Sequence, residues 1–352
     1  MKRNILIVFH NPQDNGGAEN VLQQIAFEYV RQGDIVYILF FYSRKDFRSI
    51  EIINSAHYVL YGYSGILKLR KVKFDYAYSS LIKCTFGIGV LRRMRFLQIK
   101  KFVGRESTSF FVRFSGIKRI IIRFMYKIGY KAVDLLICQT DFMRNQLLDN
   151  MPEIERYSKV VVLPNPVSLE HMNELGMMNI SEVRMNAPYI VSAGRMINEK
   201  GFDILINAFI KFRQIHPDFK LLLLGDGSLR KNFEDQVRTL GAEDHILFYG
   251  MQANVFPYFR NARMCVVSSR IEGFPNVLLQ MMSQNNNIVS TLCADGIEKI
   301  IGVYPCTPDD EQSLYKAMCQ CVNVDNSNFR NSFDQELSAR SIVNFVKGME
   351  RI

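Results

Sequence analysis

The feature that most constrains the fold is a repeated alternation of short apolar runs with stretches of helical periodicity. The apolar runs of the first half are NILIVF (4–9), IVYILFFY (35–42), HYVLYGY (57–63), YAYSS (76–80), KKFVG (100–104), DLLICQT (134–140) and KVVVLPNP (159–166). Runs of this kind, separated by helices such as the one predicted over 17–31, are typical of strands in a parallel sheet covered on both faces. The pattern predicts a doubly wound α/β domain.

A second series of the same kind follows an irregular stretch over 163–188 that is rich in Pro, Asn and Met. Its strands are predicted over 189–194, 220–227, 245–250, 264–269, 287–292 and 302–305, and its helices over 201–215, 228–240, 254–260, 275–284, 309–322 and 334–350. Single cores stop growing near ~250–300 residues, so a chain of 352 residues is long enough for two.

We therefore predict two tandem doubly wound, Rossmann-like domains facing across a cleft. The N-terminal domain is expected over 1–166, a linker over 167–187 and the C-terminal domain over 188–352, with a last helix that could pack back on the N-terminal domain. Ligands of such sheets bind at the carboxyl ends of the strands. An active site is expected between the domains.

Basic charge is concentrated in the first half of the chain. Residues 1–166 hold 26 Lys and Arg against 13 Asp and Glu, whereas residues 167–352 hold 18 against 21. The stretch 91–131 has 12 basic residues and a single acid, Glu106. A basic face favours nucleic acid, anionic lipid or a polyphosphate ligand. Since no nucleic-acid recognition module accompanies the charge, nucleic acid is not expected as a partner.

Membrane spans and metal sites are not predicted. No apolar run reaches the ~18–20 residues that cross a bilayer, and the N-terminus lacks a small-residue cleavage site, which favours a cytoplasmic protein. The seven cysteines are scattered and odd in number, so buried free thiols are expected rather than metal ligands. The five histidines are isolated and no Asp-x-Asp triplet occurs.

Two loops carry residues that suit phosphate groups. Arg195 and Lys200 follow a predicted strand, and a guanidinium and an ammonium beside a helix start suit a diphosphate, although both could be solvated surface. Gly16 and Gly17 lie at another strand-to-helix turn, where amides can approach a phosphate without a side chain in the way. A plain helix start is the alternative there, and neither the dinucleotide nor the P-loop fingerprint is present.

Five motifs, in sequence order, together resemble the family-4 retaining glycosyltransferases of the GT-B fold, most closely the bacterial enzymes that build O-antigen, capsule or exopolysaccharide. The motifs are GGAE (16–19), SAGRMINEKGFDILINAF (192–209), LLLLGDGSLR (221–230), FYGMQANVFPYFRNARMCVVSSRIEGFPNVLLQMM (248–282) and IVSTLCADGIEKII (288–301). The resemblance covers nearly the whole chain and is most specific over 189–301.

The resemblance implies a role for each matching residue. Arg195 and Lys200 would grip the donor diphosphate, and Glu272 would contact the donor sugar as the first acid of a Glu-x7-Glu motif. These three are the implied catalytic residues. The implied donor-binding residues are Gly16, Gly17, Arg195, Lys200, Glu272, Gly273, Phe274, Pro275, Asn276 and Gln280.

The sequence departs from the family at two places. Gln280 stands where a second acid would hold the ribose hydroxyls; a neutral amide makes hydrogen bonds of ~0.5–1.5 kcal/mol against ~1.5–3 for a carboxylate, so several-fold weaker donor binding is expected. VGREST (103–108) stands where many relatives have a His. There Arg105 and Glu106 could meet the acceptor or the diphosphate, or form a structural ion pair.

The function implied is metal-independent, retaining transfer of a hexosyl or N-acetylhexosaminyl group from a nucleotide sugar, expected to be a UDP-sugar, to a polyprenyl-diphosphate-linked or other glycan. The basic domain would then sit on the anionic inner face of the plasma membrane, where each Lys or Arg contributes ~1 kcal/mol. Within 116–131 an apolar helix face supports this role, and a buried helix is the alternative; that face carries Ile117, Ile120, Ile121, Phe124 and Ile128.

Two other functions remain open. A sugar-nucleotide epimerase or hydrolase could use the same fold without a lipid-facing domain. A non-catalytic donor-binding or scaffold protein is suggested by Gln280.

Overall fold

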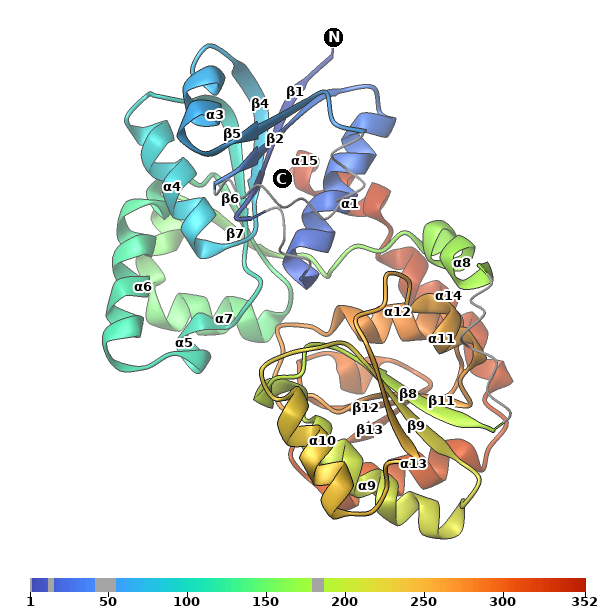
Figure 1. Cartoon of the computed structure of the whole chain (residues 1–352). Helices are drawn as coiled ribbons and strands as arrows, with labels where there is room; N and C mark the ends of the chain where they lie inside the picture. The colour runs from blue at the N-terminus through green and yellow to red at the C-terminus, as the bar shows by residue number, and fades with distance from the viewer. Residues whose placement is uncertain (1, 12–15, 42–54, 179–186) are drawn as a thin grey trace. The chain divides into compact units, whose positions relative to one another are not determined.

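The structure, a computed structural model, describes residues 2–11, 16–41, 55–178 and 187–352. It divides into two compact units, the first comprising Met1–Pro166 with Ile342–Ile352 and the second Val167–Ser341. Each unit holds one parallel sheet with helices on both faces, as the colours of Figure 1 allow the reader to follow. The predicted α/β, doubly wound class is confirmed. None of the described helices is long and apolar enough to cross a membrane.

The first unit is built on a seven-stranded sheet of order β3-β2-β1-β4-β5-β6-β7. Its strands are β1 (Asn4–Phe9), β2 (Ile35–Phe40), β3 (Tyr58–Tyr61), β4 (Lys73–Ser79), β5 (Gln98–Arg105), β6 (Leu135–Cys138) and β7 (Lys159–Val162). All the pairings are parallel. The chain order reverses between β1 and β4, and such a switch point forms a ligand crevice at the carboxyl ends of the strands.

Alternate residues of these strands are buried in two different layers. Leu6 and Val8 pack towards α3, α4, α6 and α7, while Ile5 and Ile7 pack towards α1 and α15. The described α-helices of the first unit are α1 (Gly17–Arg31), α3 (Gly62–Leu69), α4 (Ile82–Arg93), α5 (Phe110–Arg113), α6 (Gly116–Ile128), α7 (Asp141–Asn150) and α15 (Ile342–Arg351). The predicted helix over 17–31 has the expected bounds.

The second unit repeats this design with six parallel strands in the order β10-β9-β8-β11-β12-β13. The strands are β8 (Tyr189–Ala193), β9 (Lys220–Leu224), β10 (Ile246–Gly250), β11 (Met264–Val267), β12 (Ile288–Thr291) and β13 (Val303–Cys306). One face is covered by α9, α10 and α13 and the other by α8, α11, α12 and α14. These helices are α8 (Leu169–Met177), α9 (Phe202–Ile215), α10 (Arg230–Thr239), α11 (Phe256–Asn261), α12 (Asn276–Gln284), α13 (Glu311–Val322) and α14 (Arg330–Ala339).

The stretch predicted as a linker contains a packed helix. α8 buries Met172 in the core of the second unit, and the Gln284 side chain of α12 donates a hydrogen bond to the Met172 carbonyl at 2.9 Å. Residues 179–186, the rest of that stretch before Ala187, lie outside the described part of the chain. The helix was not predicted because its apolar face consists of few residues in a sequence otherwise rich in polar ones. Met172 and Leu175 belong to that face.

The single helix predicted over 334–350 is wrong, because the chain forms two helices there. α14 buries Phe333 and Leu337 in the second unit, whereas α15 buries Phe345 and Val346 in the first. Between them Ser341 forms a parallel bridge with Val167. The helix breaks because its apolar residues belong to the cores of two different units.

Candidate functional site

The carboxyl ends of two neighbouring strands in the second unit bring two predicted site residues into contact. Lys200 follows β8, and Glu272 follows β11, the next strand of the sheet. Their side chains form an ion pair and are 18% and 17% exposed. Because parallel strands all end at the same edge, residues 72 positions apart in the sequence meet there.

Further hydrogen bonds fix Glu272. The Ser269 hydroxyl donates to the same carboxylate oxygen at 2.8 Å, and the Glu272 amide donates to the Cys293 carbonyl, just beyond β12, at 2.8 Å. The side chain of Lys200 runs past Gly194, where an added Cβ would lie 3.5 Å from it. The carboxylate is thus held from two loops, while part of the Lys200 side chain remains accessible to solvent.

Glycines permit the close approach of these loops. Gly201 has φ +61°, and a Cβ there would lie 2.2 Å from the Ser268 carbonyl oxygen. The Ser268 hydroxyl donates to the Lys200 carbonyl at 2.9 Å, which joins the β8 and β11 loops. Gly225, which follows β9, has φ +123° and lies against the Gly194 carbonyl, 2.0 Å from where its Cβ would be. Any side chain at Gly201 or Gly225 would push these loops apart.

Arg270 stabilises the loop that carries Lys200. This residue was not among the site residues predicted from the sequence. Its guanidinium donates to both carboxylate oxygens of Asp203, at 2.9 and 2.7 Å, and to the Asn198 carbonyl at 2.7 Å. It also donates to Asp309 at 2.8 Å, and its amide donates to the Glu199 carbonyl at 2.8 Å. Burial opposes ionisation of Asp203, but the hydrogen bonds and charge of Arg270 outweigh it and lower the pKa of that carboxyl.

Arg195, the other predicted diphosphate residue, does not join the Lys200–Glu272 contact. Its side chain is exposed and makes no hydrogen bond or ion pair with the described residues. The backbone beside it is ordered, since the Met196 amide donates to the Asp226 carbonyl at 2.9 Å. Arg195 therefore presents a guanidinium to solvent next to the loop that carries Lys200.

The stretch Gly273–Asn276 leads into α12, whose first residue is Asn276. The Phe274 ring is buried, and the Arg340 guanidinium lies over it, 4.6 Å from the centroid. Phe274 is therefore an anchor whose side chain cannot reach a ligand without leaving the core. The backbone amides at the start of α12 carry the partial positive charge of a helix N-terminus.

Gln280 lies four residues after the start of α12 and is partly exposed. Its carbonyl accepts a hydrogen bond from the Ser283 hydroxyl at 2.7 Å, whereas its carboxamide makes none with the described residues. Asn276 and Gln280 share a helix face at this spacing. The position thus has no evident structural role that would require an amide in place of an acid.

In the first unit, Gly16 and Gly17 begin α1. Gly16 is the N-cap, without a side-chain cap, and its carbonyl accepts from the Asn20 amide at 3.0 Å. A Cβ on Gly16 would lie 2.7 Å from an oxygen of Glu19, a buried carboxylate of the first helical turn. A side chain at Gly16 would therefore make the Glu19 carboxylate shift. Residues 12–15, just before it, lie outside the described part of the chain.

Arg105 is buried at the end of β5, with only 4% of its surface exposed. Its guanidinium donates to the Ser80 hydroxyl at 3.0 Å and to the side-chain oxygen of Asn165. Burial lowers the pKa of Arg105 to about 10, although the nearby Glu19 and Glu106 carboxylates oppose that change. Ser80 and Asn165 follow β4 and β7, so this guanidinium ties together the ends of three strands.

Glu106 is equally buried, and its contacts differ from those of Arg105. Its carboxylate accepts a hydrogen bond from the Tyr126 hydroxyl of α6 at 2.7 Å, and its carbonyl accepts one from Gln139 at 3.0 Å. Burial raises the pKa of Glu106 to about 7. Arg105 and Glu106 form no ion pair with each other within the described residues, since neighbouring residues along a strand point to opposite faces.

The helix α6 exposes the apolar face that its periodicity predicts. Its exposed apolar residues are between 53% and 76% accessible: Ile117, Ile120, Ile121 and Phe124. The opposite side of the helix is packed into the core through Ile122 and Tyr126. The alternative of a helix buried through the predicted face is therefore wrong, although Ile128 at its end is half-buried.

Within the described ranges, no group of three or more His, Cys, Asp or Glu side chains could hold a metal ion. Every cysteine is free, and all except Cys319 are buried, as predicted. The metal independence of the chemistry stays a prediction.

Comparison with known proteins finds similarity to glycosyltransferases over part of the chain. Residues 187–323 match the family model described as "Glycosyl transferases group 1". An uncharacterized glycosyltransferase of Methanocaldococcus jannaschii is 27% identical over 190 residues, 53% of this chain and 46% of that protein. The N-acetylgalactosamine-N,N'-diacetylbacillosaminyl-diphospho-undecaprenol 4-alpha-N-acetylgalactosaminyltransferase of Campylobacter jejuni is 25% identical over 209 residues, 59% of this chain and 52% of that protein. The alignments thus span about half the length of these relatives.

Among solved structures, HepE from Anabaena in complex with UDP-glucose has a TM-score of 0.79 at 16% identity, covering 99% of this chain and 100% of that one. At this level of identity the similarity shows a shared fold.

Proposed function

Since this chain carries a glycosyl transferases group 1 domain on a GT-B fold, we propose that it is a retaining glycosyltransferase acting in cell-surface polysaccharide synthesis. It would move a hexosyl or N-acetylhexosaminyl group from a UDP-sugar to a lipid-linked glycan. The observation that carries this proposal is the Lys200–Glu272 pair at the carboxyl edge of the second sheet.

The Lys200–Glu272 ion pair can bind a donor while it stays intact. An ammonium has three donor hydrogens and Glu272 uses one of them, so Lys200 can still donate to a diphosphate oxygen. Glu272, held by Ser269, has acceptor capacity left for sugar hydroxyls. Arg195 extends from the same β8 loop into solvent, where it could swing onto the diphosphate.

The proposed reaction breaks the bond between the anomeric carbon and the diphosphate oxygen while the acceptor hydroxyl approaches the same face of the sugar. Negative charge develops on the leaving UDP, and Lys200, Arg195 and the amides at the start of α12 would stabilise it. The leaving diphosphate takes the proton of the acceptor hydroxyl as the new glycosidic bond forms. No side chain has to act as a nucleophile, and no metal is required in this scheme.

The proposed acceptor is a polyprenyl-diphosphate-linked glycan. The name of the Campylobacter jejuni relative gives a diphospho-undecaprenol acceptor for that protein, which supports the same class here. The exposed apolar face of α6 also supports it, because the exposed Lys118 and Arg123 lie on the same helix and would meet anionic lipid headgroups. We place the protein at the inner face of the plasma membrane, bound peripherally.

Calorimetric titration with UDP- and GDP-sugars, comparing wild type with Gln280→Glu, tests this function. We expect one UDP-sugar to bind, and the acid to tighten binding several-fold, because a carboxylate is the stronger acceptor for ribose hydroxyls. Gln312→Glu, which adds the same charge at an exposed position of α13, should leave the affinity unchanged. If no donor binds either protein while both remain folded, the proposed function fails.

Turnover separates the remaining alternatives. Donor binding without transfer to a lipid-linked acceptor would indicate the scaffold function, and conversion of the donor in the absence of any acceptor would indicate an epimerase or hydrolase.

A further inference from the structure

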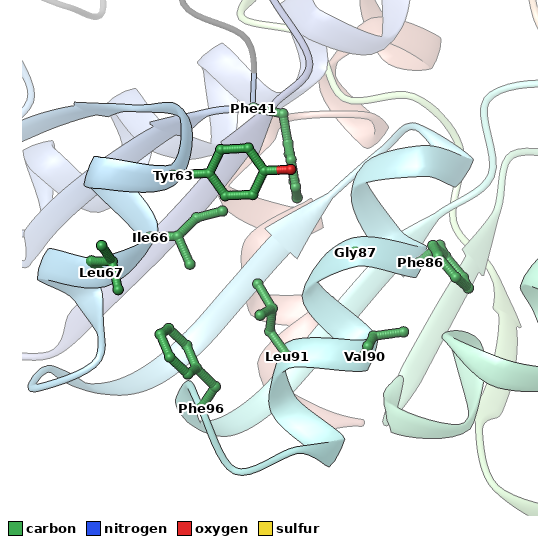
Figure 2. Close-up of a pocket in the computed structure, with 9 residues that line it drawn as sticks. All are labelled: Phe41, Tyr63, Ile66, Leu67, Phe86, Gly87, Val90, Leu91 and Phe96. Atoms are coloured by element: carbon green, nitrogen blue, oxygen red, sulfur yellow. The ribbon is translucent and has the colours of Figure 1, made fainter.

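An apolar pocket of about 390 Å³ lies between α3 and α4 of the first unit (Figure 2). Figure 2 shows Tyr63, Ile66 and Leu67 on α3 and Val90 and Leu91 on α4, on either side of it. The complete lining is Phe41, Tyr63, Ile66, Leu67, Phe86, Gly87, Val90, Leu91 and Phe96. The Tyr63 hydroxyl is the single polar side-chain group among them.

The inner wall of this pocket is packed against the core of the first unit, and its rim is exposed. Ile66 is buried in the core of the first unit, and Phe41, Leu91 and Phe96 pack against the same core. By contrast, Tyr63 is 89% and Leu67 61% exposed, so large apolar side chains at the rim face solvent. An apolar surface left open above a fixed wall is typical of a binding site rather than of an ordinary helix contact.

The sequence that forms the pocket is strongly basic. Between residues 62 and 100 the sequence has nine Lys and Arg and one acid, Asp75. The Arg70 guanidinium lies over the ring of the pocket residue Phe96, 5.5 Å from its centroid, and Lys68 follows Leu67 on α3. An apolar pocket with a cationic rim is complementary to a ligand with an apolar chain and an anionic head.

The size of the pocket fits a short part of such a chain. At the ~30 Å³ that one water occupies in the liquid, 390 Å³ holds on the order of a dozen heavy atoms, roughly two five-carbon isoprene units. The aromatic walls of Phe41, Phe86 and Phe96 offer flat surfaces for a branched, unsaturated chain.

We propose that this pocket binds the isoprene units next to the diphosphate of a polyprenyl-diphosphate carrier, with the diphosphate at the Arg70 and Lys68 rim. The inference rests on the proposed function, because the ligand is the lipid-linked acceptor of that reaction. The pocket would bind the lipid part of this acceptor, in addition to the site that binds its glycan. It differs from the role of α6, whose exposed face would contact the bilayer and not a single lipid chain.

The test is calorimetric titration of the full chain with farnesyl diphosphate below its micellar concentration, and with inorganic diphosphate. We expect farnesyl diphosphate to bind at least tenfold more tightly than diphosphate. The double variant Tyr63→Ser, Leu67→Gln should lose most of that difference while binding diphosphate as wild type does. Both positions are exposed, so the fold should tolerate the changes. The matched double variant Ile117→Gln, Ile120→Gln on α6 should bind farnesyl diphosphate normally and lose binding to anionic vesicles.

Several results would overturn the proposal. Farnesyl diphosphate could bind no better than diphosphate, or the α3 and α6 variants could weaken it equally. Dodecyl diphosphate, with a linear chain of matched length, could bind as tightly, which would make the pocket a general alkyl site. If instead the wild type dimerises in analytical ultracentrifugation and the Tyr63→Ser, Leu67→Gln variant does not, while neither binds farnesyl diphosphate, the occupant is a second copy of this chain.

Failure of this inference is distinguishable from failure of the proposed function. The same preparations are assayed for transfer from the UDP-sugar to a soluble glycan acceptor without a lipid. If that transfer occurs without farnesyl binding, only the pocket assignment falls. Farnesyl binding without any transfer or donor binding overturns the transferase function instead.

Discussion

Both units have charged residues at the carboxyl ends of their parallel strands, but these residues differ in burial and in the partners that hold them. In the first unit Arg105 and Glu106 are each 4% exposed, and each is held by neutral side chains of the core. In the second unit Lys200 and Glu272 pair with one another at 18% and 17% exposure. The comparison separates charges that are enclosed by the fold from charges that remain accessible to a ligand.

Desolvation is the physical basis of the difference. Burial moves the pKa of Glu106 up to about 7 and that of Arg105 down to about 10, because each charged form has lost most of its water. A group of this kind affects stability strongly. The Lys200–Glu272 pair keeps part of its hydration and spare hydrogen-bonding capacity, so removing it should affect ligand binding more than folding.

The largest expected effect is on catalysis. Lys200→Ala should lower kcat/KM for sugar transfer on the order of 10²–10³-fold, the range typical when a preorganised donor to developing negative charge is removed. Lys211→Ala is the matched control, because it breaks a more exposed ion pair with Glu311 on the same unit. Steady-state kinetics with saturating acceptor provides the measurement. A loss below tenfold for Lys200→Ala would remove Lys200 from the proposed mechanism.

The next prediction concerns the enclosed acid of the first unit. Because the folded-state pKa of Glu106, about 7, lies above its ordinary value of 4.5, the folded protein binds this proton more tightly than the unfolded chain. The resulting stabilisation is complete below the unfolded pKa and is lost as the pH rises through about 7. Between pH 5 and pH 8, wild type should lose on the order of 3 kcal/mol relative to Glu106→Gln, which mimics the protonated form.

Urea unfolding of both proteins across this pH range measures that difference, with the transition of each unit analysed separately. Glu155→Gln removes an exposed carboxylate from the same unit and serves as the control. Parallel pH profiles for wild type and Glu106→Gln would contradict the assignment.

The smallest expected effect tests Arg270 as a positioning residue. Arg270→Lys keeps the charge but loses the planar fork that holds Asp203 at 2.9 and 2.7 Å. The loop that carries Lys200 should then become more mobile. The lost hydrogen bonding, about 1–2 kcal/mol, should raise KM for the donor about tenfold, while kcat changes less. Arg238→Lys, within an exposed pair on α10, is the control. An unchanged KM together with a lower melting temperature would assign Arg270 to stability alone.

Much of the fold was predictable from the sequence because parallel strands buried on both faces leave a strong apolar pattern. The resemblance implied that Lys200 and Glu272 share a donor site, but their direct ion pair was not predicted, because it depends on β8 and β11 being neighbours in the folded sheet. The amphipathic period of α6 identified its apolar face, but it could not say which side is packed. The core takes Ile122 and Tyr126 instead, and Tyr126 is needed there to donate a hydrogen bond to Glu106.

Other features depend on contacts between distant segments and had no local signal. Arg270 meets Asp203 and Asp309, 67 and 39 residues away, and only the folded sheet brings them together. The Arg195 side chain is exposed, and its role at the donor diphosphate stays a prediction. The break between α14 and α15 was hidden since Arg340 and Ser341 are compatible with a helix.

The position of α15 also sets the order in which the protein can be completed during synthesis. Phe345, Val346 and Met349 close the core layer beside α1, yet they leave the ribosome only after the whole of Val167–Ser341 has been made. Until then that sheet face of the nascent first unit is covered by α1 without α15, so part of the apolar face stays open while the second unit is made. A pause in translation before Ile342 would expose that face to aggregation or to chaperones.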